Sequence, residues 1–123
     1  MNSFEIHRLR LEREATGRAY LEFLRAPDLS LGLYVLPAGG RDPQSPHTED
    51  EAYYVVSGRA RVRVGAETQL VGPGSIVFVE AGIPHRFEEI EEELTVLVVF
   101  GPAEGSRKQD RSNEAATRED ATR

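Results

Sequence analysis

The fold is decided by the stretch Arg59-Ala60-Arg61-Val62-Arg63-Val64. Charged and small apolar residues alternate in it without exception, and successive side chains of a β-strand point to opposite faces of a sheet. The alanine and the two valines therefore lie on one face, and the three arginines lie on the other. The stretch predicts a β-strand with a buried inner face and a solvated outer face.

The sequence around this stretch, from Ala19 to Phe100, consists of short β-type runs separated mainly by glycine, proline and aspartate, without a window of helical periodicity. It predicts an all-β fold. Short strands that close on themselves form a small barrel or a jelly-roll sandwich, whose interior can hold one small ligand. The expected strands are 20–24, 31–36, 52–56, 60–64, 69–71, 76–79, 85–89 and 94–100, with a turn at Ser57–Gly58 and a solvated acidic loop at 88–93.

The chain has 123 residues, which falls in the range of a single domain. Residues 19–102 are expected to form the barrel. The scattered apolar residues of segment 1–18 fit a short strand, a marginal turn of helix or an irregular segment. Residues 103–123 contain no aromatic side chain and no aliphatic one larger than alanine, so they cannot offset their ordering entropy and are expected to form a disordered polar tail.

Composition limits the classes of function. The formal net charge of −6, without a basic cluster, argues against nucleic acid as a partner. No stretch approaches the roughly 18 apolar residues that a membrane span needs, so we expect no membrane partner and a cytoplasmic protein. Cysteine is absent and Lys108 is the one lysine, which excludes disulfides and thiolate ligands and argues against a catalytic amine.

Two segments place a histidine beside strand sequence. His47 precedes Glu51 at the start of one expected strand, and His85 begins a later one. Two imidazoles and one carboxylate are the set that non-haem metal sites use most often, so these three residues are the candidate metal ligands. The third histidine of the chain, His7, lies outside both segments and is expected at the surface.

The spacing of His47 and Glu51 decides how they can share one ion. Four residues apart, they would meet on one face of a helix, but Pro46 and the aromatic, β-branched run that follows are poor helix context. Four residues of straight strand span about 13 Å and would separate the two ligands. We therefore expect a bend at residues 48–50, with both side chains pointing inward.

Strand alternation orients the neighbours of these ligands. With Glu51 inward, Tyr53 also points inward, where its phenol is a candidate catalytic proton donor or substrate clamp; simple packing is the alternative. On the later strand Phe87 shares the inner face with His85. Glu89, further along the same strand, is expected near the rim, too far away to ligate.

Both segments resemble the two motifs of the cupin family, and the resemblance covers most of the expected barrel. The first motif is glycine, five residues, His-x-His, three or four residues, glutamate, six residues and glycine. The second is glycine, five residues, Pro-x-Gly, two residues, histidine, three residues and asparagine. The corresponding positions here are Gly39, Ser45, His47, Glu51 and Gly58 for the first motif, and Gly74, Glu80, Gly82, His85 and Glu89 for the second.

The resemblance implies a fold and a cofactor. A cupin is a jelly-roll barrel, also called a double-stranded β-helix, whose histidines and glutamate bind a divalent transition metal such as iron, manganese, nickel or zinc. Carried over by position, the ligands here are His47, Glu51 and His85. Ser45 stands where the family has its first histidine, which leaves a three-ligand site. Gln44, next to it, is the candidate weak fourth ligand, and water is the alternative.

Three kinds of function fit these parts. The first is metal-dependent chemistry of oxygenase, isomerase or lyase type on a small molecule. The second is a non-catalytic module that binds or senses a small molecule or a metal. The third is a metal-free barrel that acts through oligomerisation. The last expected strand, 94–100, is apolar on both faces, which predicts that its outer face meets a second copy in a homodimer.

Overall fold

The computed structural model describes residues 1–107 of the chain. Within them the chain forms mostly antiparallel β-structure, so the prediction of an all-β fold is confirmed. No helix in this part of the chain is long and apolar enough to cross a membrane. The elements are α1 (Ile6–Thr16), β1 (Tyr20–Ala26), β2 (Leu29–Leu36), β3 (Asp50–Val64), β4 (Glu67–Val71), β5 (Ile76–Val79) and β6 (His85–Gly101).

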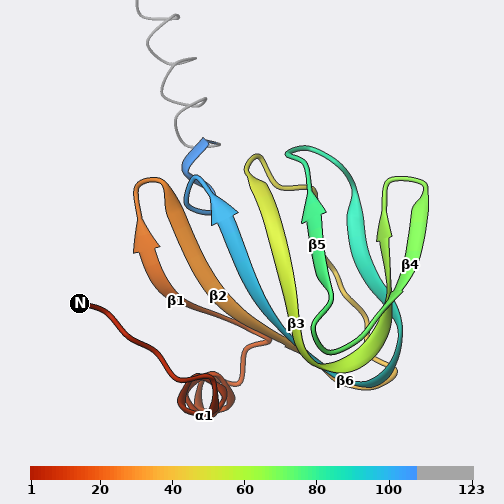
Figure 1. The fold of residues 1–123 in the computed structure, drawn as a ribbon, viewed down its shortest axis with the longest axis horizontal. Helices are drawn as coiled ribbons and strands as arrows, with labels where there is room; N and C mark the ends of the chain where they lie inside the picture. The colour runs from red at the N-terminus through yellow and green to blue at the C-terminus, as the bar shows by residue number, and fades with distance from the viewer. Residues whose placement is uncertain (108–123) are drawn as a thin grey trace, which may run out of the picture.

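The strands form one antiparallel sheet in the order β1-β2-β6-β3-β4, with β5 paired to β3. Two long strands, β3 and β6, run through both halves of the sheet. Residues 50–57 of β3 pair with residues 95–101 of β6, and residues 59–64 pair with residues 85–92. Figure 1 shows the sheet bending along these two strands, so that β1 and β2 lie on one side of the molecule and β4 on the other. This is the expected jelly-roll barrel.

The bend in β3 is built at Gly58, where the sequence suggested a turn between two strands. The φ angle of Gly58 is 94°, and the pairing with β6 is irregular between Val55 and Arg61. A Cβ atom at this position would lie 2.1 Å from the carbonyl oxygen of Glu93, so only glycine fits. The prediction of separate strands at 52–56 and 60–64 was therefore wrong, because a bulge continues the pairing that a turn would end.

The acidic run at residues 88–93 is also part of a strand, contrary to the expected solvated loop. It lies within β6, opposite the arginines of β3. Like-charged arginines line one face of β3, and the glutamates neutralise them across the sheet. The pairs are Arg63–Glu88 at 3.0 Å, Arg61–Glu89 at 3.0 Å and Arg59–Glu92 at 4.0 Å.

The inner faces of the strands form the core, as the alternation predicts. On β3, Tyr53, Val55, Ala60 and Val62 are buried, whereas Tyr54 is exposed. These side chains pack with the inner residues of β2 and β6 in one hydrophobic cluster. The prediction that Glu51 and Tyr53 point inward is confirmed.

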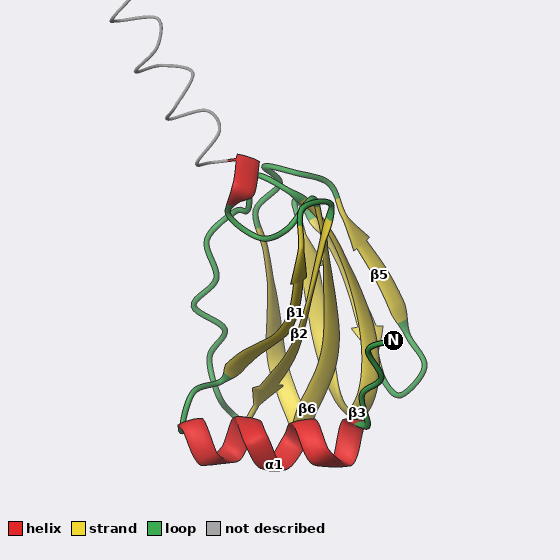
Figure 2. Ribbon diagram, turned by 90° about the vertical axis from the view of Figure 1, so that its left-hand side faces the viewer, coloured by secondary structure: helices red, strands yellow, loops and turns green. Residues whose placement is uncertain are grey.

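The segment before residue 19 contains an α-helix of 11 residues. Of the alternatives that the sequence left open, this agrees with the turn of helix, although the helix is longer than expected, and not with the short strand or the irregular segment. Arginine, leucine, glutamate and alanine dominate α1, and these residues have high helix propensity. Gly17, with a φ angle of 71°, ends the helix in the left-handed conformation typical of C-caps. Leu9 is buried under the sheet, and Figure 2 shows α1 lying across one end of the strands.

The boundary of the expected polar tail was also wrong. Residues 103–107 pack against the barrel: Ala103 is buried, and the amide of Glu104 donates a hydrogen bond to the Ser30 hydroxyl at 2.9 Å. Small and polar residues were assigned to a tail because they bury little apolar surface, but backbone hydrogen bonds hold this segment. The remainder of the expected tail, 108–123, lies outside the described residues.

Candidate metal centre

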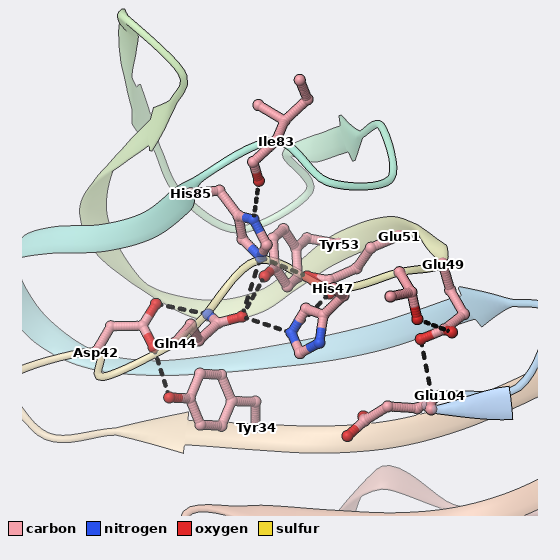
Figure 3. Close-up of polar contacts among 12 residues, drawn as sticks. Tyr34, Asp42, Gln44, His47, Glu49, Glu51, Tyr53, Ile83, His85 and Glu104 are labelled. Carbon is pink, nitrogen blue, oxygen red and sulfur yellow. Dashed lines mark hydrogen bonds and ion pairs between the residues drawn. The ribbon is translucent and has the colours of Figure 1, made fainter. Parts of the chain in front are cut away.

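Three candidate ligands from two distant segments of the chain meet inside the barrel (Figure 3). Glu51 lies on β3, His85 is the first residue of β6, and His47 belongs to the connection between β2 and β3. One ligand atom from each residue lies within 4.8 Å of the other two. A bend at residues 48–49 precedes the start of β3, so the predicted bend between His47 and Glu51 is present.

Backbone contacts hold the two histidine segments together. The amide of Gly82 donates to the carbonyl of His47 at 2.7 Å, and the amide of Ala81 donates to the Asp50 carboxylate at 2.9 Å. The turn before His85 is therefore tied directly to the bend after His47. This explains how a site shared by two loops acquires a fixed geometry.

Glu51 has the surroundings of a metal ligand. It is 2% exposed, and its two carboxylate oxygens lie 3.4 Å from Nε2 of His85 and 3.5 Å from Nε2 of His47. Neither oxygen accepts a hydrogen bond from any residue that the structure describes. A buried carboxylate without hydrogen-bond donors is costly. A divalent metal therefore fits the site for two reasons. Two imidazoles and one carboxylate are suitable ligands, and the metal would compensate the buried negative charge of Glu51.

His85 is oriented by its other ring nitrogen. Nδ1 lies 2.8 Å from the carbonyl oxygen of Ile83, so it carries the proton and donates it, which directs Nε2 into the site. Burial alone would lower the pKa of His85, but the Glu51 carboxylate, the Ile83 carbonyl and the charge of Asp42 outweigh it and raise the pKa. The imidazole is thus surrounded by groups that favour a cation at Nε2.

Gln44 reaches the same point from the connection between β2 and β3. Its amide oxygen lies 3.1 Å from Nε2 of His85 and 3.4 Å from Nε2 of His47, and it accepts a hydrogen bond from the Tyr53 hydroxyl at 3.0 Å. Its amide nitrogen donates to the Asp42 carboxylate at 2.6 Å, which fixes the orientation of the amide. The oxygen of Gln44 is therefore directed at both imidazoles.

Asp42 is a site residue that the sequence did not reveal. It is buried and accepts three hydrogen bonds: from the Gln44 amide, from the Tyr34 hydroxyl at 2.6 Å and from the amide of Phe87 at 2.8 Å. Two of its partners lie on separate strands, β2 and β6, so no local pattern marked it. Asp42 positions the candidate fourth ligand. It does not itself belong to the ligand group, which consists of His47, Glu51 and His85.

Tyr53 lies beside the ligands as a neutral phenol. Burial is the largest cause of its raised pKa, and the Glu51 carboxylate adds to it. Its hydroxyl donates to Gln44, and its ring packs 4.8 Å from that of Phe87, measured between centroids. The group is therefore arranged to donate a hydrogen bond and not to act as a phenolate base.

The other residues considered from the sequence lie outside the site. Ser45, at the position of the first histidine of the motif, is exposed. Glu89 is exposed at the outer face, where it pairs with Arg61, because its φ angle of 50° interrupts the alternation after Phe87. His7 is exposed on α1.

A cavity of about 200 Å³ opens beside the ligands. It lies between the inner faces of β1, β2, β3 and β6, and Gln44, His47 and Tyr53 form the part of its wall next to the site. Other parts of its wall are formed by Tyr20, Tyr34, Phe100 and Glu104. A small molecule in this cavity would therefore touch the ligand group directly.

Fold and site together define a small jelly-roll barrel with two imidazoles and one carboxylate in its interior. The sequence model of the Cupin domain matches residues 32–100. The chain belongs to the cupin family, and the resemblance seen in the two motifs is confirmed.

Individual relatives agree with this membership. An uncharacterized protein of Streptomyces coelicolor is 53% identical over 104 residues, which make up 85% of this chain and 99% of that protein. The structure of TT1209 from Thermus thermophilus superposes with a TM-score of 0.66 and 28% identity, over 83% of this chain and 98% of that one. The DMSP lyase DddQ from Ruegeria pomeroyi DSS-3 gives a TM-score of 0.58 and 27% identity, over 62% of this chain and 39% of that one.

Proposed function

We propose that this cupin is a metal-dependent protein that acts on a small molecule in the cavity beside His47, Glu51 and His85. The observation that carries the proposal is the buried Glu51 carboxylate, which lies between two imidazole Nε2 atoms and accepts no hydrogen bond from the described residues. A divalent transition metal, such as iron, manganese, nickel or zinc, satisfies this carboxylate and suits imidazole ligands.

The residues of the chain have separate roles in this proposal. His47, Glu51 and His85 hold the metal, and Gln44 is the candidate fourth ligand, held by Asp42. Bound there, the metal supplies Lewis-acid or oxygen-activating chemistry of oxygenase, isomerase or lyase type. Tyr53 donates a hydrogen bond from its neutral phenol toward the ligand group. The similarity to DddQ supports the lyase option, although this chain spans 39% of that protein.

The test is the metal content of the purified protein, measured by inductively coupled plasma mass spectrometry. We expect close to one equivalent of a transition metal in the wild type and a loss of it in the His47→Ala, His85→Ala double variant. His7→Ala removes the third histidine, which is exposed on α1, and should retain the metal. Equal metal content in all three proteins would contradict the site.

A second candidate is a non-catalytic module that binds or senses a small molecule. The Tyr53 hydroxyl donates its hydrogen bond to Gln44, and this contact favours the binding module. A general acid or base must instead be free to form a hydrogen bond with the substrate. Molecules extracted from the purified protein and identified by mass spectrometry can be incubated with the metal-loaded protein. Recovery of the same molecule unchanged supports a binding module, and its conversion supports an enzyme.

We also propose a homodimer formed through the outer face of the sheet. Outward apolar residues follow one another across β2, β6, β3 and β5 in two rows, and Ile76, Phe78 and Tyr54 are exposed there. An apolar patch that crosses four strands is typical of a protein–protein contact. The rows are Leu31–Val99–Ala52–Phe78, across all four strands, and Leu97–Tyr54–Ile76, across three; Leu33, the next residue of the second row, is fully buried in the single chain.

Light scattering coupled to size-exclusion chromatography tests this interface. The Ile76→Lys, Phe78→Lys double variant should run as a monomer where the wild type runs as a dimer, because two charges would be buried in the contact. Leu11→Lys, at an exposed apolar position of α1, is the matched control and should remain a dimer. A monomeric wild type would remove the proposal.

The expected cytoplasmic location and the absence of nucleic-acid and membrane partners stay predictions.

A further inference from the structure

The cavity beside the candidate metal centre has a chemical character of its own. Its wall carries the carboxylate of Glu104 and the aromatic rings of Tyr20, Tyr34 and Phe100. Among the described residues that line it, none is lysine or arginine. Its volume of about 200 Å³ is below the roughly 300–1,000 Å³ of pockets for drug-sized ligands, which limits the occupant to a few non-hydrogen atoms.

Glu104 is a built part of this wall. Its amide donates to the hydroxyl of Ser30, which is fully buried, and the next amide, of Gly105, donates to the Glu49 carboxylate at 2.8 Å. The preceding residue, Ala103, is buried in the barrel. The backbone of three consecutive residues is therefore fixed, and the side chain of the middle one, Glu104, lines the cavity. Figure 3 shows Glu104 and Tyr34 on the His47 side of the ligand group, away from His85.

The charge around Glu104 is predominantly negative. Burial raises its pKa, and the nearby carboxylates of Glu22, Glu51 and Glu49 raise it further. Arg25 acts in the opposite direction, but its guanidinium contacts the Glu22 carboxylate and the backbone carbonyl of Glu104, each at 2.9 Å. The carboxylate itself thus has no hydrogen-bonded cation among the described residues. A cation inside the cavity would relieve this repulsion, whereas an anion would increase it.

The aromatic wall favours the same kind of ligand. The rings of Tyr20 and Tyr34 meet edge to face, with their centroids 6.0 Å apart. Tyr20 lies directly over Gly32, where an added Cβ atom would be 2.0 Å from the tyrosine oxygen. Its hydroxyl is buried and has no hydrogen-bond partner among residues 1–107. Aromatic faces with a nearby carboxylate are the surroundings in which proteins bind substituted ammonium groups.

We propose that this cavity binds a small organic cation of the substituted ammonium class, with Glu104 as its counter-ion and Tyr20, Tyr34 and Phe100 as its aromatic wall. The assignment of this cation as the substrate of the neighbouring centre rests on the proposed function. The binding of the cation by the cavity does not, because Glu104 and the aromatic wall belong to the protein alone.

Choline and 3,3-dimethyl-1-butanol are the matched probes for this site. They have the same shape and the same hydroxyl, but the alcohol carries a carbon where choline carries a quaternary nitrogen, so it is neutral. Isothermal titration of the full-length protein, as purified and after treatment with EDTA, should give saturable binding of choline. We expect the neutral alcohol to bind at least about tenfold more weakly, because it lacks the attraction to Glu104 and the rings.

The Glu104→Gln variant removes the charge and keeps the shape of the side chain. It should weaken choline binding about tenfold and leave the neutral alcohol unchanged. Glu67→Gln, on the exposed strand β4, makes the same charge change away from the cavity and should bind choline like the wild type. Equal affinity for the two probes, failure of both to bind, or full choline affinity in Glu104→Gln would each overturn the proposal.

Metal analysis of the same samples separates this proposal from the proposed function. Glu104→Gln should contain as much metal as the wild type, because Glu104 does not belong to the ligand group. A metal-free protein that still prefers choline would keep the cation site and remove the metal-dependent function. A metal-loaded protein that does not distinguish the two probes would remove the cation site and keep the metal-dependent function.

Discussion

Glu49, just before β3, and Glu51, at its start, lie two residues apart, are both 2% exposed and have opposite surroundings. Glu49 accepts hydrogen bonds from the Thr48 hydroxyl and from the amides of Gly105 and Arg107, at 2.8 and 3.2 Å for the two amides. Glu51 accepts none from the described residues. One buried carboxylate is satisfied by the protein, and the other is not.

The difference separates a structural carboxylate from a candidate ligand. Burial alone would raise the pKa of Glu49, but its hydrogen bonds hold the pKa below the ordinary value, so Glu49 is stable as an anion. Glu51 depends for its compensation on two imidazoles that could share a cation with it. The C-terminal segment 103–107 is thus fastened by one glutamate, while the barrel interior keeps the other available.

Replacement of Glu51 tests this contrast with the largest expected effect. In Glu51→Gln the affinity for the metal should fall by at least about 100-fold, because loss of a ligand exceeds the 10–100-fold typical of its hydrogen-bonded partners. The metal-free variant should be at least as stable as the metal-free wild type, because a buried charge without donors has been removed. Metal titration and urea denaturation measure the two quantities. A stability loss with unchanged metal affinity would reverse the roles of the two glutamates.

Replacement of Glu49 should give the opposite pattern. Glu49→Gln retains one acceptor but loses the charge, so we expect a fall of about 1–3 kcal/mol in the free energy of unfolding. Metal content should equal that of the wild type. Glu67→Gln on the exposed part of β4 is the control for the change itself and should leave both quantities unchanged. A Glu49→Gln variant that lost its metal would show that the tether of the C-terminal segment also shapes the ligand group.

The contrast between the glutamates could not be predicted from the sequence, and the reason is physical. The alternation in residues 59–64 and the inward direction of Glu51 are local properties of a strand, so they were predicted correctly. Two of the three hydrogen-bond partners of Glu49, Gly105 and Arg107, lie more than 50 positions away, and no periodicity relates them to it. Sequence separation of the same kind concealed Asp42, whose partners include Phe87.

The length of α1 and the strand at residues 88–93 had signals in the sequence that were given too little weight. The helix α1 is rich in good helix formers and is followed by Gly17, a typical C-cap. The acidic run 88–93 and the arginines of residues 59–63 carry opposite charges. Pairing of these two segments as neighbouring strands would have explained both patterns. In each case a pattern that reads as polar surface was part of a regular element.

Glu88 extends the comparison to a carboxylate at the surface and carries the smallest expected effect. Hydrogen bonds from Arg63, and then the contacts with Arg86, hold its pKa below the ordinary value. Because the folded-state pKa is lower than the unfolded one, the pairing contributes stability above the unfolded pKa, and the contribution is lost as the pH falls through the folded pKa. The urea midpoints of wild type and Glu88→Gln should therefore differ slightly at neutral pH and converge in acid. Salt screens exposed ion pairs, so it should reduce the same difference at neutral pH. A difference that persists both in acid and at high salt would mean that Glu88 stabilises the sheet by something other than its charge.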